Sequence, residues 1–361
     1  MAQSLLQTVF SPVKIFSHME KMYKWWQGEN IYPITLELGP SGAANCNNRC
    51  NFCMHHSYYD ARAMMEFEFY KRIVDELKEL GVKGMIFSAS GEPLVNAEII
   101  DFISYTKQIG VDVALVTNGT AWQKDNLVET VIRDVAWTRT SLDAGTPETR
   151  ARIHGVSTKD FERVLESLKM LAQEKAKTGS SCHIGAQMVI IEENRWEVYE
   201  ATRKVKDAGI DYFQIKPAVF HPKDNKRQLP REFWETAMIL IEAAKRDFED
   251  ENFDVFAKYD QFQAIMAPDY EKSAYEKCRA IFFPIIEATG KVYHCSQTRG
   301  LPEFELGDLN HSSFQEIWES ERRKEILENV DVSTCQPVCR CHWLNKMLKT
   351  VALGENAPSF I

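Results

Sequence analysis

The sequence has no apolar run that approaches the length of a membrane-spanning helix, although 44% of its 361 residues are apolar. Its first residues, "MAQSLLQTVFSPVKIF", lack the basic segment and the small-residue cleavage site of a secretory signal. A basic net charge is also absent, since the formal charge is −9, which argues against a broad nucleic-acid-binding surface. We therefore expect a cytoplasmic protein with an ample core and with neither a membrane nor a nucleic acid as partner.

Strand and helix patterns alternate over much of the chain, without internal repeats. Near-continuous apolar strands separated by amphipathic helices are typical of a parallel α/β sheet. No G-x-G-x-x-G opens a first helix, so we favour a partial, TIM-like (β/α)6 barrel over a doubly wound sheet. The strand patterns lie at residues 32–39, 82–90, 111–119, 135–143, 182–191 and 210–217, and the helix patterns between them lie at 69–81, 96–110, 124–134, 158–179 and 195–209.

Changes in composition divide the chain into four expected parts. These are an N-terminal helical segment (1–30), the partial barrel (31–225), a charged helical bridge (226–270) and a small cysteine-rich domain (271–361). Five of the nine cysteines lie in the last part. Because the cysteines are grouped by ligand-like spacing and no secretory signal precedes them, we expect reduced, metal-binding thiols rather than disulfides.

Three cysteines stand in one short loop after the first strand pattern, "NCNNRCNFCM", as Cys46, Cys50 and Cys53. The loop lies at the C-terminal edge of the expected barrel, the face that carries chemistry in such folds. A structural zinc ion takes four ligands, for which His55 or His56 would be the nearest addition. A 4Fe–4S cluster takes one thiolate per iron, so three thiolates leave one iron open to a substrate or cofactor. We favour the cluster over the zinc ion.

This loop matches the C-x3-C-x2-C signature of the radical S-adenosylmethionine (radical SAM) superfamily, including the aromatic Phe52 before the last cysteine. The resemblance implies that the open iron chelates S-adenosylmethionine. It further implies that reductive cleavage of this cofactor gives a 5′-deoxyadenosyl radical, which abstracts hydrogen from the substrate. An electron donor of the flavodoxin or ferredoxin type is implied as well.

Further motifs that resemble those of the family follow in order at successive strand ends. "SGEP" resembles the G-G-E-P motif with Ser90 in place of the first glycine, and implies that Glu92 binds the methionine amino group. "SLDAGTPETRARIHG" resembles the segment at the fourth strand. The resemblance implies these additional cofactor-binding residues: Asn118 after the third strand, Ser141 and Asp143 for the ribose hydroxyls, Arg152 for the methionine carboxylate, and the main chain near Met188 for adenine.

The C-terminal cysteines are Cys278, Cys295, Cys335, Cys339 and Cys341. The stretch "CRAIFFPIIEATGKVYHC" predicts a β-hairpin that brings its two cysteines together. After it, residues 312–330 predict a helix that opens with a capping box. From spacing alone, a zinc ribbon competes with an iron–sulfur cluster here.

The spacing C-x11-G-x4-C at the start of this region resembles the SPASM/twitch extensions of radical SAM enzymes. That resemblance implies one auxiliary 4Fe–4S cluster, with one of the five cysteines left over. The ending "CQPVCRC" departs from the usual twitch pattern. It therefore leaves open which two of Cys335, Cys339 and Cys341 are ligands.

A fully ligated auxiliary cluster can accept an electron. The resemblance therefore implies a radical SAM oxidoreductase of the dehydrogenase type, which oxidises a carbinol of a sugar, cyclitol or nucleotide sugar. The alternatives are modification of a peptide or protein side chain, or redox-neutral epimerisation or dehydration. The last would need a thiol hydrogen donor, and Cys182 opens its strand at the opposite rim. Candidate general bases are His55, Glu192, Lys216 and His221, each of which has a purely structural alternative.

Overall fold

The computed structural model describes residues 12–53, 61–88, 90–218, 229–267, 275–278, 283–335, 339 and 341–353. His55, His56 and His221 lie outside the described residues, so their proposed roles stay predictions. Within the described part of the chain, no helix is long and apolar enough to cross a membrane.

One ten-stranded sheet organises the chain, in the order β10-β9-β8-β1-β2-β3-β4-β5-β6-β7. Strands β1 to β7 are parallel, β8 lies parallel to β1, and β9 and β10 continue the sheet in antiparallel pairing. The strands are β1 (Thr35–Leu38), β2 (Gly84–Phe87), β3 (Asp112–Thr117), β4 (Val135–Ser141), β5 (His183–Ile190), β6 (Tyr212–Pro217), β7 (Asp254–Ala257), β8 (Ile285–Ile286), β9 (Lys291–Tyr293) and β10 (Glu305–Asp308).

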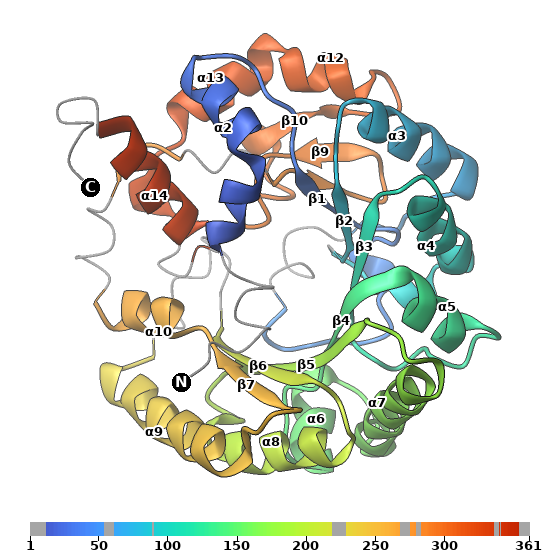
Figure 1. Cartoon of the computed structure of the whole chain (residues 1–361). Coiled ribbons are helices and arrows are strands. Elements are labelled where there is room, and N and C mark those ends of the chain that lie inside the picture. Colours follow the sequence, from blue (N-terminus) through green and yellow to red (C-terminus); the bar gives the residue numbers. More distant parts are fainter. Residues whose placement is uncertain are drawn as a thin grey trace.

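The parallel strands form an arc, and helices α3, α4, α5, α7, α8 and α9 cover its outer face (Figure 1). The helices that follow the strands are α3 (Phe67–Glu79), α4 (Ile99–Gln108), α5 (Leu127–Asp134), α6 (Pro147–His154), α7 (Lys159–Thr178), α8 (Val198–Asp207), α9 (Arg231–Phe248) and α10 (Tyr259–Met266). Apolar side chains from the sheet and these helices form the main core. This is the expected partial barrel.

The structure corrects the expected strand number and the expected bridge. The segment 226–270 is not only helical, because it contains β7, which pairs with β6 over four positions and adds a seventh parallel strand. The strand is four residues long and lies between acidic residues in "FEDENFDVFAKYD". Such a short run carries a weak periodic signal, and only pairing with β6 makes it a strand.

The cysteine-rich C-terminal part extends the barrel sheet. The predicted hairpin is present as β8 and β9, and β8 pairs with β1. The predicted helix at 312–330 is two helices, α12 (Phe314–Glu319) and α13 (Glu321–Asn329), because Ser320 ends the first and caps the second. The expected capping box of Ser313 and Glu316 is confirmed.

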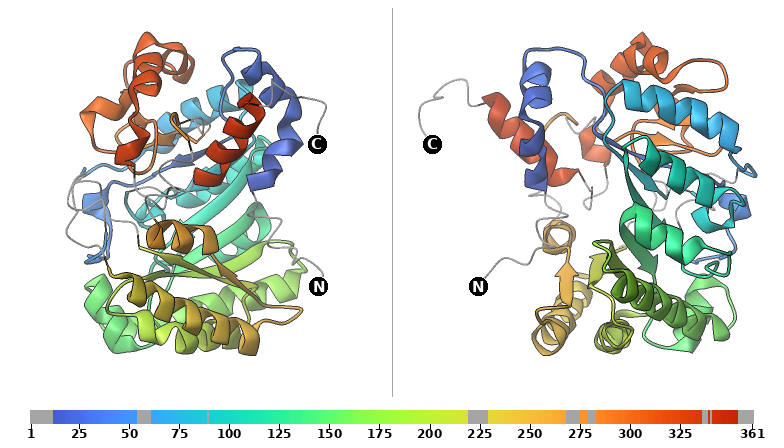
Figure 2. Two further views of the ribbon diagram at one scale, coloured as in Figure 1. Left: turned by 90° about the vertical axis from the view of Figure 1, so that its left-hand side faces the viewer. Right: turned by 45° about the vertical axis from the view of Figure 1, so that its right-hand side comes forward.

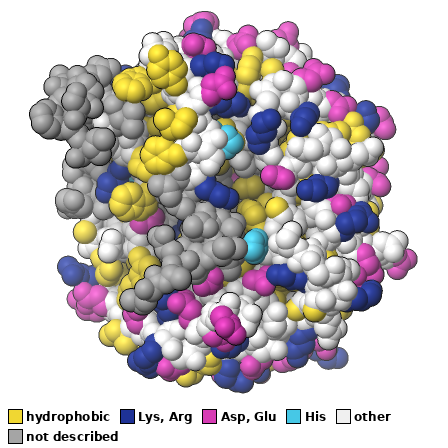
Figure 3. All heavy atoms as spheres, in the orientation of Figure 1, with side chains coloured by type: hydrophobic (Ala, Val, Ile, Leu, Met, Phe, Trp, Pro, Cys, Tyr) yellow, Lys and Arg dark blue, Asp and Glu magenta, His cyan; other side chains and the backbone are white. Residues whose placement is uncertain are grey.

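The N-terminal helix α2 (Met19–Trp26) and the C-terminal helix α14 (His342–Leu353) lie side by side (Figures 1 and 2). A small second hydrophobic cluster joins these regions, and Cys278 and Cys341 pack against it. Figure 3 shows hydrophobic side chains gathered over this corner of the molecule. The large exposed ones are Phe16, Met19, Tyr23, Trp26 and Trp343.

Candidate active site

The three-cysteine loop lies between β1 and α3 and docks on the C-terminal end of α6. The amides of Arg49 and Asn51 donate to the carbonyls of His154 and Ile153, both at 2.8 Å. Gly155 ends α6 with φ +63°, and a Cβ there would lie 3.0 Å from the Arg49 carbonyl oxygen. Only glycine suits both the left-handed conformation and this close approach. The loop that carries the thiols is therefore held by the segment after β4.

The thiols of Cys46, Cys50 and Cys53 are partly buried and free of disulfides. Burial raises the pKa of Cys46 to about 11, and burial together with the other two thiols raises that of Cys50. The metal-free loop therefore holds neutral thiols at Cys46 and Cys50, and metal binding must release their protons.

The donor set fits a cluster. In a cubane each thiolate binds its own iron, so three thiols on one loop can hold three irons and leave the fourth open. His55 and His56, the nearest further ligands for a zinc ion, lie outside the described residues.

Asn118 joins the cluster loop to the end of β3. Its side-chain amide nitrogen donates to Asn47 Oδ1 at 2.7 Å and lies 4.0 Å from the Cys46 sulfur. Its Oδ1 accepts from the amide and hydroxyl of Thr120. The predicted site residue thus lies beside the first cysteine, although the structure does not test its contact with a cofactor.

The carboxylate of Glu92 is fully buried and accepts three hydrogen bonds from its own chain. The donors are the hydroxyl of Thr117 at 2.5 Å, the amide of Asn118 at 2.6 Å and the amide of Leu94 at 3.0 Å. Burial, partly offset by these bonds, raises its pKa. One of about four lone-pair sites is left for a ligand. The predicted bond to a methionine amino group therefore stays a prediction, and the observed role is to join two strand ends.

Ser90, which replaces the first glycine of the family motif in the "SGEP" loop, contacts the C-terminal part of the chain. The hydroxyl of Ser90 donates to Glu287, a fully buried residue of the C-terminal part 197 positions away. A Cβ on the neighbouring Gly91 would lie 2.5 Å from the carbonyl oxygens of Ser41 and Gly42, so this loop presses against the segment after β1. The C-terminal part thus contacts the loop directly through the residue that replaces glycine.

Ser141 and Asp143 lie together at the end of β4. The Ser141 hydroxyl accepts from Gln187, and Asp143 Oδ1 accepts from the amide of Val189 at 2.7 Å. Asp143 Oδ2 lies 3.4 Å from His154 Nε2. Asp143 is left-handed at φ +55°, an uncommon conformation that aspartate tolerates better than most residues. The structure places both residues at the C-terminal edge, and their contact with ribose stays a prediction.

Two buried residues of this segment were missed by the motif analysis. His154 Nδ1 lies 3.1 Å from the Cys50 sulfur. Arg150 is completely buried and donates to Asp160, to the carbonyls of Ser141 and Leu142, and to that of Asn118. The "RARIH" spacing puts them four residues apart on one helix face, which is the signal that could have revealed them.

The remaining predicted residues are placed as follows. The ring of Phe52 packs edge-on against His154 at 5.7 Å. Arg152 is exposed and donates to Thr149 and the Glu193 carbonyl, so a bond to a methionine carboxylate is untested. The side chain of Met188 lies in the core with no exposed area, so only its main chain can serve the expected role.

The two candidate bases among the described residues differ in exposure. Glu192 is exposed beyond the end of β5, whereas Lys216 is partly buried near the end of β6. Burial, Arg139 and Lys258 lower the pKa of Lys216 to about 8. Cys182 is buried just before β5, as expected for a structural cysteine, and burial raises its pKa to about 12.

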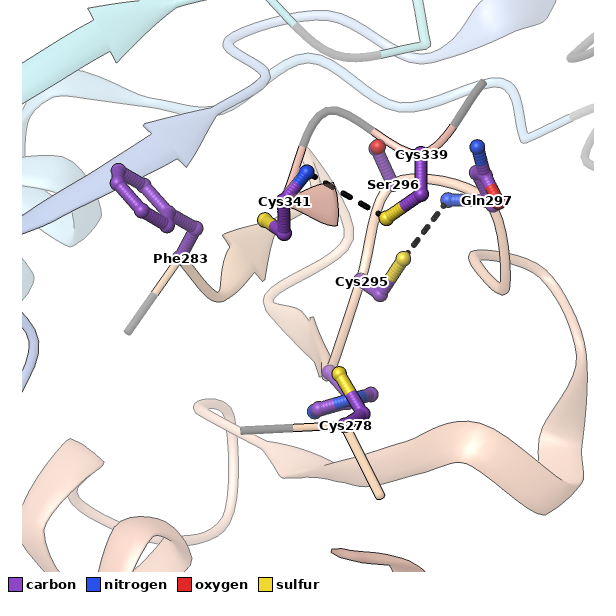
Figure 4. Close-up of a pocket in the computed structure, with 8 residues that line it drawn as sticks. Cys278, Phe283, Cys295, Ser296, Gln297, Cys339 and Cys341 are labelled. Atoms are coloured by element: carbon purple, nitrogen blue, oxygen red, sulfur yellow. Dashed lines mark hydrogen bonds between the residues drawn. The ribbon is translucent and has the colours of Figure 1, made fainter. Parts of the chain in front are cut away.

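A second cysteine group lines a pocket between β9 and the start of α14. Four thiols line it, those of Cys278, Cys295, Cys339 and Cys341 (Figure 4). The sulfurs of Cys295 and Cys339 accept from main-chain amides at 3.3 and 3.4 Å. Hydrogen bonds of this kind stabilise thiolates bound to iron. In the sequence, Cys278 precedes the β8–β9 hairpin and Cys295 follows it, whereas Cys339 and Cys341 come from the C-terminal segment.

Buried charges join this part to the barrel interior. Arg299 lies 3.2 Å from Glu37 on β1 and 3.3 Å from Glu287 after β8. All three side chains are at most 7% exposed. The Ser88 hydroxyl also donates to Glu37 at 2.9 Å. Because unpaired buried charges cost several kcal/mol, this group fixes the C-terminal part against β1 and β2.

These observations define a class: an α/β barrel with three thiols at the C-terminal edge of β1 and a second cysteine-lined pocket in a C-terminal extension. Residues 42–205 match the family model described as "Radical SAM superfamily", and residues 258–342 match SPASM, described as "Iron-sulfur cluster-binding domain". The chain belongs to the radical SAM superfamily and carries a SPASM domain. Its cofactors are therefore a 4Fe–4S cluster, S-adenosylmethionine and an auxiliary iron–sulfur cluster.

Relatives of known role share modest identity with the chain. The bacteriocin subtilosin biosynthesis protein AlbA of Bacillus subtilis is 25% identical over 304 residues, which cover 81% of this chain. A protein of Pyrococcus furiosus that modifies the cofactor of tungsten-containing aldehyde ferredoxin oxidoreductase is 26% identical over 46% of this chain. The chain spans 61% and 47% of the lengths of these two relatives.

A solved structure confirms the fold. SuiB of Streptococcus suis, bound to its precursor peptide SuiA, superposes with a TM-score of 0.66 at 16% identity, covering 89% of this chain and 72% of that one. At this level of identity the likeness concerns the fold alone.

The pocket suggests which cysteine is left over. Cys335 does not line it, although Cys339 and Cys295 lie near enough to contribute, after burial, to raising its pKa to about 12. We expect Cys335→Ala to keep about eight irons per chain and the matched Cys339→Ala to fall to about four, since each cubane holds four. Iron and sulfide analysis of both reconstituted variants measures this, and the opposite pattern would reverse the assignment.

Proposed function

We propose that the protein oxidises a carbon–hydrogen bond of a polar substrate held inside the barrel, and that the SPASM cluster accepts an electron. The observation that carries this proposal is that one sheet holds two separate sets of thiols. Three thiols lie in the loop after β1, and four line the pocket beyond β9. When bound, the cofactors supply a 5′-deoxyadenosyl radical and an electron acceptor. We also propose that a flavodoxin or ferredoxin supplies the electron for cleavage of S-adenosylmethionine.

The strand register supports a polar substrate. In a strand, successive side chains alternate between the two faces, so one residue in two faces the interior. The pairing of β4, β5 and β6 aligns Ser141 with Gln187 and Gln214. Apolar residues on the same strands, such as Met188 and Ile215, pack in the core under the helices. The polar positions on the interior face of this register are Glu37, Ser88, Arg139, Ser141, Gln187, Gln214 and Lys216. They share that face with apolar residues, including Ile86, Ala114, Val116, Trp137 and Val189.

Hydroxyl and amide groups in the interior suit a polyhydroxylated molecule, so the substrate we favour is a carbinol of a sugar, cyclitol or nucleotide sugar. The hydroxyl proton needs a base, for which the candidates among the described residues are Glu192 and Lys216. The likeness to AlbA over most of the chain favours a peptide side chain as the second candidate substrate.

Isotope transfer tests this proposal. Anaerobically reconstituted holoenzyme is incubated with dithionite, S-adenosylmethionine and polyols deuterated at one carbinol carbon. We expect deuterium in 5′-deoxyadenosine together with a ketone product. A parallel series uses short peptides deuterated at serine and cysteine β-carbons. Transfer from peptides alone would replace the carbinol proposal, and no transfer from either series would count against oxidation at a carbon–hydrogen bond.

A further inference from the structure

Two lysines reach the barrel interior from neighbouring strand ends. Lys216 is the fifth residue of β6, and Lys258 directly follows β7. The amide of Lys258 donates to the carbonyl of Ile215 at 2.9 Å, which continues the β6–β7 ladder and makes the two lysines neighbours. Adjacent strands lie about 4.8 Å apart, so the two side chains start from adjacent points.

The charged groups that act on Lys216 indicate the face of the sheet on which its side chain lies. Glu37 on β1 and Asp143 after β4 both act on it, although β1 and β6 are separated by four strands of the sheet. Glu37 can reach Lys216 only across the interior of the arc. The side chain of Lys216 therefore lies on the inner face of the sheet, opposite to Ile215, which packs in the core under the helices.

Neither ammonium has an anionic partner among the described residues. Within the described ranges, the ammonium groups of Lys216 and Lys258 form no ion pair and no side-chain hydrogen bond. The Lys258 ammonium lies 4.8 Å from the centre of the Phe256 ring, and Asp260 is the carboxylate that acts on it. The interior carboxylates are already engaged, Glu37 by Arg299 and Asp143 by the Val189 amide and His154. Two partly buried like charges side by side are unfavourable unless an anion neutralises them.

We propose that Lys216 and Lys258 form a subsite that binds an anionic group, a phosphate or a carboxylate, of a small-molecule substrate. This inference rests on the proposed function, since it concerns the substrate of that site. Two ammonium groups on neighbouring strand ends provide up to six N–H donors for an oxyanion. Burial, followed by Arg139, lowers the pKa of both lysines, whereas Asp260 opposes this change at Lys258.

Anion binding to the reconstituted holoenzyme tests the subsite without turnover. Inorganic phosphate and acetate are titrated separately, so that the two arms distinguish a phosphate from a carboxylate. We expect millimolar binding of at least one, weakened about tenfold in Lys216→Met and in Lys258→Met because each loses one charge-assisted bond. Lys216→Arg keeps the charge and should bind within about threefold of wild type. Lys169→Met, on the exposed face of α7, is the matched control and should change nothing.

Two further readouts separate the possible failures. Formation of 5′-deoxyadenosine by the wild type without substrate tests the proposed chemistry separately from the subsite, and the control Lys169→Met should leave it unchanged. The dissociation constant of S-adenosylmethionine should be unchanged in all four variants. The two Lys→Met variants could weaken the binding of S-adenosylmethionine as much as the binding of the free anion. In that case the lysines hold the carboxylate of the cofactor, and the subsite is overturned. Binding of neither anion to wild type, or binding to both Lys→Met variants as tight as to wild type, would also overturn it.

The pH dependence gives an independent check. The groups that act on Lys216 from the surrounding elements are Arg139, Lys258, Asp143 and Glu37. With a pKa of about 8, the lysine is charged below that pH and loses its proton above it. The affinity for sulfate, whose own charge is constant here, should therefore fall above pH 8 by up to about tenfold per unit. In Lys216→Arg this fall should be reduced or move to higher pH, because only Lys258 can then lose its proton, and a pH profile identical to that of wild type would contradict the subsite.

Discussion

Replacing Cys46, Cys50 and Cys53 together by alanine should lower the iron content of the reconstituted protein from about eight to about four atoms per chain. The auxiliary pocket keeps its four lining thiols in this variant. Cleavage of S-adenosylmethionine should fall below detection, because that cofactor can bind only at an iron left open by three thiolates. Iron and sulfide analysis, with 5′-deoxyadenosine measured by chromatography, gives both numbers.

The matched control is Cys182→Ala, which removes a buried thiol that belongs to neither group. It should keep the iron content and the cleavage rate of the wild type. If the triple variant retained about eight irons, or if the anaerobically prepared wild type bound zinc in place of iron at the loop, the assignment of the radical SAM cluster would be wrong.

Arg150→Met should lower the free energy of unfolding by about 3–5 kcal/mol, because it leaves the buried Asp160 carboxylate without its partner. The Arg150 Nε donates to Asp160 Oδ2 at 2.7 Å, and both residues are at most 4% exposed. The same guanidinium donates to the Asn118 carbonyl at 3.0 Å, so its loss also frees the end of β3. Urea unfolding of the anaerobic holoenzyme measures the change.

Two comparisons make this prediction specific. Arg163→Met removes an exposed guanidinium that lies 3.9 Å from the same carboxylate, and it should cost less than about 1 kcal/mol. The double variant Arg150→Met/Asp160→Asn should recover part of the loss, because the amide is neutral. Equal costs for the two arginine variants would show that burial of the Arg150–Asp160 pair does not matter.

Much of the barrel follows from local patterns. The predicted helix at 69–81 is α3, and the strand at 135–143 is β4, each within a few residues of its predicted ends. These segments carry a clear period of 3.6 or a continuous apolar run, signals that need no distant partner. The strand β7 lacked such a signal, because four residues that begin with Asp254 are too few for a clear period and become a strand only by pairing with β6.

The residues of the candidate site likewise include some that local motifs predicted and others that became apparent only in the packed structure. The motifs predicted Glu92, Asn118 and Asp143, and the structure joins the first two at the ends of β2 and β3 and holds the third beside His154. Arg150 and His154 were not predicted, since a buried arginine and histidine in a polar helix look like solvent-facing residues until the helix is packed.

The sequence by itself determined the chemistry of the metal sites, because thiolate spacing within a loop of eight residues is a local property of the chain. The tertiary structure alone decided how the two cysteine groups are held in one body. The contact of Ser90 with Glu287 spans 197 positions and the ion pair of Arg299 with Glu37 spans 262, and these partners meet only after β8 adds to β1. Contacts of that range depend on the whole sheet being formed, so no local pattern can encode them.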